Sequence, residues 1–119
     1  MSEKKSDDHY VQLPTALTRE ELQSAIERAS DAVGLYISHI GSYSRKKYPN
    51  SVHWHFKRDP KEPGLIDATF WDVKHLFWLM VRHREPAWVH ELVPAFLDAL
   101  RREVASPMDD GLAAHQRYI

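Results

Sequence analysis

Apolar residues recur every three or four positions after Thr18, and this period predicts a long amphipathic helix. Thr18 and Glu21 form a Thr-x-x-Glu capping box, in which the hydroxyl and the carboxylate each bind a backbone amide of the first turn. The pattern continues past Gly34, so Gly41 is the expected stop. The apolar positions of this stripe are Leu22, Ala25, Ile26, Ala29, Val33, Tyr36, Ile37 and Ile40.

Three segments rich in aromatic and β-branched residues follow, at 51–58, 65–71 and about 75–83, and each is expected to form a strand. The connections between them are short. A parallel return needs a crossover of a dozen or more residues, so these strands are expected to pair as an antiparallel meander.

Alternation along the first two strands predicts one apolar and one polar face. The expected core residues are Val52, Trp54, Phe56, Ile66, Ala68 and Phe70. The outer face then carries His53, His55, Lys57, Asp67, Thr69 and Trp71. The third strand is apolar on both sides, so its orientation cannot be read from alternation.

A second amphipathic helix is expected after Glu85 and Pro86, with a kink or a split first turn at Pro94. The predicted fold is α+β: a two-layer α-β-β-β-α domain, with a three-stranded meander and both helices packed on one face. Its expected boundaries are a flexible lead-in at 1–17, a single domain at 18–105, and a loose or docked tail at 106–119.

Composition narrows the function classes. Sixteen Lys and Arg against 17 Asp and Glu give a net charge of -1, which argues against coating nucleic acid by bulk charge. The absence of cysteine excludes disulfides, thiol catalysis and thiolate metal sites. No apolar run is long enough to span a membrane, so a cytoplasmic location without membrane contact is expected. No cofactor-binding or catalytic motif is present, so a binding protein is favoured over an enzyme.

The surplus of large apolar side chains requires a cover for the outer face of the sheet, which is either the two termini of the same chain or a partner. The partner would be another protein or a second copy in a homodimer, and this interpretation is favoured. A single layer of helices cannot cover both faces of the third strand. The residues expected to form this contact surface are His53, His55, Lys57, Asp67, Thr69, Trp71 and Trp78.

A metal site on the same face is an alternative. His53 and His55 alternate on one strand and therefore point the same way. If His55 lies opposite Asp67, and His53 opposite Thr69, two imidazoles and a carboxylate meet. This is the ligand set of several zinc and non-haem iron sites.

Nucleic-acid binding is the other alternative. The basic residues that would hold phosphates are Arg45, Lys46, Lys47, Lys57, Arg58 and Arg82. The order helix, three strands, helix is also that of double-stranded RNA-binding domains. The last helix begins with Glu85-Pro86-Ala87-Trp88 and lacks the lysine cluster that those domains use, so no family is assigned.

Overall fold

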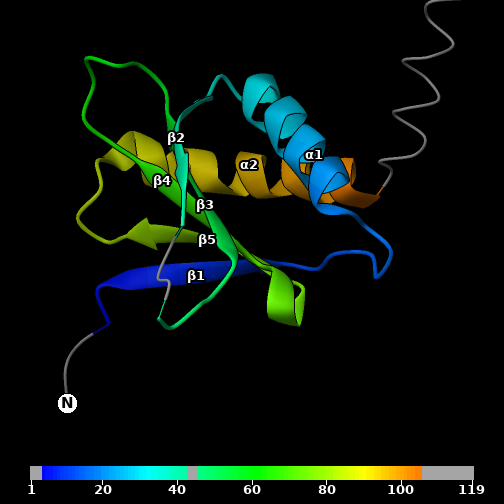
Figure 1. Ribbon diagram of the computed structural model, residues 1–119. Helices are drawn as coiled ribbons and strands as arrows, with labels where there is room; N and C mark the ends of the chain where they lie inside the picture. The colour runs from blue at the N-terminus through cyan, green and yellow to red at the C-terminus, as the bar shows by residue number, and fades with distance from the viewer. Residues whose placement is uncertain (1–3, 43–45, 106–119) are drawn as a thin grey trace, which may run out of the picture.

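The computed structural model describes residues 4–42 and 46–105, and these form an α+β fold with a five-stranded antiparallel sheet and two helices (Figure 1). In chain order the elements are β1 (Ser6–Val11), α1 (Arg19–Ala32), β2 (Tyr36–Gly41), β3 (Ser51–Lys57), β4 (Ile66–Trp71), the short 3-10 helix η1 (Asp72–Lys74), β5 (Leu76–Arg82) and α2 (Ala87–Ala105).

The sheet has the strand order β1-β5-β4-β3-β2. The expected meander is present as β3, β4 and β5 at its centre, but the expectation of only three strands is wrong. One additional strand, β1, lies within the segment expected as a flexible lead-in and pairs along β5 (Figure 1). The other, β2, pairs with β3 and forms the opposite edge. The expected tail at 106–119 lies outside the described residues.

Helix α1 begins as expected, because both hydrogen bonds of the Thr18 capping box are formed. It ends at Ala32, well before the expected stop at Gly41. Gly34 has a φ of +77°, and its amide donates to Asp31 O while the Leu35 amide donates to Ser30 O. These two bonds are the Schellman motif, which satisfies the last carbonyls of a helix and turns the chain away. Residues 36–41 are consequently released to form a strand.

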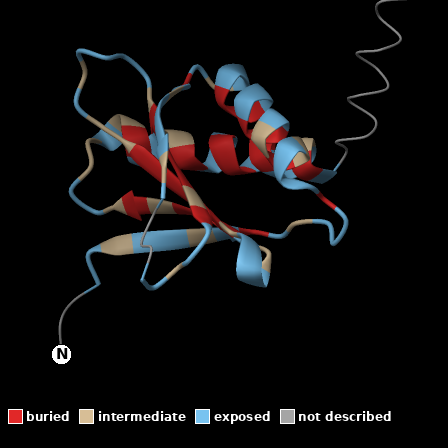
Figure 2. Cartoon of the chain, in the orientation of Figure 1, coloured by how far each residue is buried: buried red, intermediate tan, exposed pale blue. Residues whose placement is uncertain are grey.

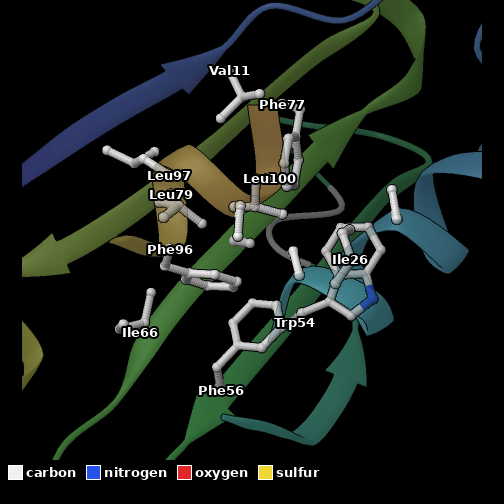
Figure 3. Close-up of a cluster of buried hydrophobic side chains, with 14 of the residues drawn as sticks. Val11, Ile26, Trp54, Phe56, Ile66, Phe77, Leu79, Phe96, Leu97 and Leu100 are labelled. Carbon is white, nitrogen blue, oxygen red and sulfur yellow. The ribbon is translucent and has the colours of Figure 1, made fainter. Parts of the chain in front are cut away.

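The inward-facing side chains of the sheet and the apolar stripes of both helices form one buried cluster. Figure 3 shows Ile26 from α1 and Phe96, Leu97 and Leu100 from α2 in the same cluster as Trp54 and Phe56 of β3, with the ring of Phe96 beside that of Phe56. In β5 the core face is that of Phe77, Leu79 and Val81, which alternation alone left open. Figure 2 shows that buried positions concentrate in the central strands, whereas β1 is exposed or half-buried along most of its length.

Helix α2 runs without interruption through Pro94, so the expected split of its first turn does not occur. Neither helix within the described part of the chain combines the length and apolar character needed to cross a membrane. The cytoplasmic location stays a prediction.

Candidate metal centre

The outer face of the sheet carries the polar side chains that alternation assigned to it. Antiparallel pairing sets His53 opposite Thr69 and His55 opposite Asp67. This is the register on which the expected histidine and carboxylate cluster depends, and it is confirmed. Since residues opposite one another across a strand pair share a face, the four side chains lie together.

The two imidazoles converge on a single oxygen atom. Nε2 of His53 and Nε2 of His55 each lie 3.0 Å from Oδ1 of Asp67. A tetrahedral ion with bonds of about 2.0–2.2 Å separates its ligand atoms by roughly 3.3–3.6 Å. The three ligand atoms all lie within 4.8 Å of one another, so small side-chain rotations would suffice to surround an ion.

Thr69 holds the other nitrogen of His53. Its Oγ1 lies 2.7 Å from His53 Nδ1, and both side chains are buried. A hydroxyl can donate or accept, so Thr69 can serve either tautomer of the ring. When Nε2–H donates to Asp67, the hydroxyl donates to Nδ1. When Nε2 binds a metal, Nδ1–H donates to the hydroxyl, as the outer-shell partner of a ligating histidine does.

Asp67 is fully buried, and its second oxygen is occupied. Oδ2 lies 2.5 Å from Nη1 of Arg82, a residue of β5 that also approaches Glu85 at 3.9 Å. Burial raises the pKa of Asp67. The hydrogen bond with His53 and the charge of Arg82 together lower it by more than burial raises it, so the pKa lies below its ordinary value. The carboxylate is therefore ionised at neutral pH, and Arg82 leaves Oδ1 directed at the imidazoles.

His55 forms the open side of the cluster, because 32% of its side chain is exposed, compared with 8% for His53. Burial lowers the pKa of His55 below its ordinary value. Asp67 opposes this shift, while the neighbouring His53, His39 and Arg82 reinforce it. A neutral imidazole is the form that binds metals, so this environment favours a ligand over a cation.

A third imidazole, that of His39, lies beside the cluster and was missed by the sequence analysis. His39 is paired with His55 across β2 and β3, and the ring centroids are 5.2 Å apart. The ring also lies over Gly41, where a Cβ would come within 2.8 Å of His39 Nε2. The helical period through residue 40 hid this strand, although the β-branched Ile37 and Ile40 beyond Gly34 were a signal for it.

The remaining residues of the expected contact surface are more buried than residues of a solvent-exposed binding surface would be. Trp78 is only 4% exposed and Trp71 is half-buried, because the ring of Tyr48 contacts both, at 5.1 Å from Trp71 and 5.5 Å from Trp78. Lys57 is also half-buried, and its Nζ donates to the carbonyls of Glu62 and Gly64.

Several of the expected nucleic-acid residues contact neighbouring side chains of the protein. Arg58 pairs with Glu62 and stacks on the ring of Trp88 at 4.5 Å, and Arg82 is held by Asp67. Lys46 and Lys47 are exposed in the connection between β2 and β3, where Lys47 lies over the ring of Tyr48 at 5.5 Å, whereas Arg45 lies outside the described residues. The described residues of the set therefore lie in the connection between β2 and β3, at the end of β3 and at the end of β5.

No protein-family model matches the chain, and neither the curated proteins nor the solved structures include a significant match to it.

Proposed function

We propose that the outer face of the sheet binds a divalent metal ion, zinc or ferrous iron, through His53, His55 and Asp67. The observation that carries this proposal is the position of both Nε2 atoms, each 3.0 Å from the same carboxylate oxygen. Two imidazoles and one carboxylate suit these ions, and three protein ligands leave coordination positions for water or a further ligand.

Metal binding at this site exchanges protons for the ion. Both Nε2 atoms must give up any proton that they share with Asp67 before they can donate a lone pair. Thr69 then accepts Nδ1–H of His53, so the ring keeps its orientation. Arg82 keeps Oδ2, which makes Asp67 a ligand through Oδ1 alone. Water or a further ligand would reach a bound ion from the side of His55, whose side chain is 32% exposed.

Zinc titration by calorimetry of chelator-treated protein tests the proposal. The expected stoichiometry is about one ion per chain, and His53→Ala or His55→Ala should weaken binding at least about 100-fold, since loss of an outer-shell partner alone costs about 10–100-fold. For the same reason Thr69→Val should weaken it about tenfold. His90→Ala removes an exposed imidazole on α2 and is the matched control. Equal zinc affinity in the wild type and the His53→Ala/His55→Ala double variant would sink the proposal.

Contact with a protein partner or a second copy is a second candidate, favoured by exposed apolar side chains near the start of β5. Tyr10 is 55% exposed and stacks on Trp78, and Val73 and Leu76 are also exposed. Association through this end of the sheet would cover them. Sedimentation that yields only the monomer mass at all accessible concentrations would exclude the homodimer.

A further inference from the structure

A cationic hollow lies on the outer face of the sheet, where the chain enters β1 and leaves β5. Its volume is about 520 Å³, within the range of small-molecule sites. Four cationic side chains and a histidine line it, together with Ser6 and Met80. The cationic residues are Lys4, Lys5, Arg82 and Arg84, and the histidine is His83.

Backbone pairing fixes the walls of this hollow. Ser6 lies opposite Arg82 in the ladder between β1 and β5, and the His83 amide donates to the carbonyl of Lys5 at 2.9 Å. The ladder therefore extends past the two strand ends. Arg82 is further fixed by Asp67, so one wall of the hollow is the same guanidinium that holds the carboxylate of the candidate metal centre.

The charges around the hollow do not balance. Among the described residues, no carboxylate lines it. Asp7 contacts Lys4 at 3.7 Å and His83 at 3.2 Å, while Asp67 and Glu85 offset Arg82. Within the described part of the chain, Lys5 and Arg84 take part in no ion pair.

Asp8 is the other acid of β1. It is exposed on this face opposite Met80, two residue pairs along the ladder from Ser6 and Arg82, and it does not line the hollow. Counting only residues 4–42 and 46–105, two positive charges, those of Lys5 and Arg84, therefore face the hollow uncompensated.

We infer that this hollow binds a small phosphate monoester. A phosphate monoester carries a charge of about −1.5 to −2 at pH 7, which matches the two uncompensated cations. Arginine supplies a planar fork for two phosphate oxygens, and lysine supplies a point charge. The volume leaves room for an organic group of about the size of one ring beside the phosphate. None of the candidate metal ligands is needed for this binding.

The test is a titration of ¹⁵N-labelled, chelator-treated protein with phenyl phosphate at constant ionic strength, with benzoate as the carboxylate of similar shape. Saturable shifts are expected for the amides of Lys5, Ser6, His83 and Arg84, with phenyl phosphate binding at least about tenfold more tightly than benzoate. Lys5→Gln/Arg84→Gln should weaken phenyl phosphate at least about tenfold, because each removed cation loses one charge-assisted contact.

Lys61→Gln/Arg102→Gln is the matched control, because it removes the same charge from exposed positions on the β3–β4 connection and on α2. Equal loss of affinity in both double variants would overturn the inference, as would equal binding of the two ligands or shifts confined to other surfaces. Because the protein is metal-free throughout, failure of zinc binding leaves this result unaffected. Failure here likewise leaves the metal proposal standing.

Discussion

Asp67→Ala is expected to lower the free energy of unfolding by about 2–3 kcal/mol and to abolish tight zinc binding. The change removes the fully buried carboxylate that both histidines and Arg82 contact. Breaking a fully buried ion pair costs about 3–5 kcal/mol because the remaining charge is stranded. The expected loss is smaller here because 33% of the Arg82 side chain is exposed and can regain some hydration. Chemical denaturation and calorimetry measure the two effects.

Two further variants separate the causes of this loss. Asp8→Ala removes an exposed carboxylate from the same face and should change stability by less than about 0.5 kcal/mol. Adding Arg82→Met to Asp67→Ala should recover part of the lost stability, because the stranded cation is gone, without restoring zinc binding. An Asp67→Ala protein as stable as the wild type would show that the buried network does not hold the sheet together.

Phe96→Ala is expected to cost about 3–5 kcal/mol of unfolding free energy, the range for truncating a buried aromatic side chain. Phe96 is 0% exposed, and its ring packs edge-on against Phe56 at 4.9 Å. Truncation leaves a cavity where α2 packs against the central strands (Figure 3). Urea denaturation measures the loss. The dependence of the unfolding free energy on urea concentration is expected to be the same in both proteins.

Val73→Ala is the control for Phe96, since it shortens an apolar side chain that is 59% exposed and should be nearly neutral. Phe96→Leu keeps most of the volume and should lose clearly less stability than Phe96→Ala. Similar losses for Phe96→Ala and Val73→Ala would contradict the packing of α2 on the sheet described above.

The centre of the sheet was predictable from sequence because each central strand carries its own evidence. Trp54 and Phe56 alternate with His53 and His55, and only one of these sets can enter an apolar core. Short connections then force antiparallel pairing. The orientation of the third strand could not be predicted from the sequence. Phe77 and Trp78 are equally suited to burial, and tertiary contacts decide which of them faces the core.

The two edge strands were missed for different physical reasons. Six residues of β1, Ser-Asp-Asp-His-Tyr-Val, include only one that is buried, Val11, so little local pattern marks them. Their order comes from pairing with β5, about 70 residues away along the chain. In β2, Tyr36, Ile37 and Ile40 continue a helical period, and only the left-handed Gly34 turns the chain out of the helix.

Features of the outer face that depend on the missed strands β1 and β2 could not be predicted from the sequence, whereas features of β3 and β4 could. His53, His55 and Asp67 lie on the two strands whose register was correctly assumed, so their convergence followed from the sequence. His39 depended on β2, and the hollow of Lys4, Lys5 and Arg84 depended on β1. Pairing between distant segments creates both features, and composition does not report it.

Anomalous diffraction at the zinc absorption edge, from crystals of protein loaded with zinc, would locate an ion held by the two imidazoles and the carboxylate of this face. A peak is expected about 2.0–2.2 Å from Nε2 of His53, Nε2 of His55 and Oδ1 of Asp67. A zinc peak found only at the exposed pair of Asp7 and His83, with none beside Asp67, would contradict the proposed metal site.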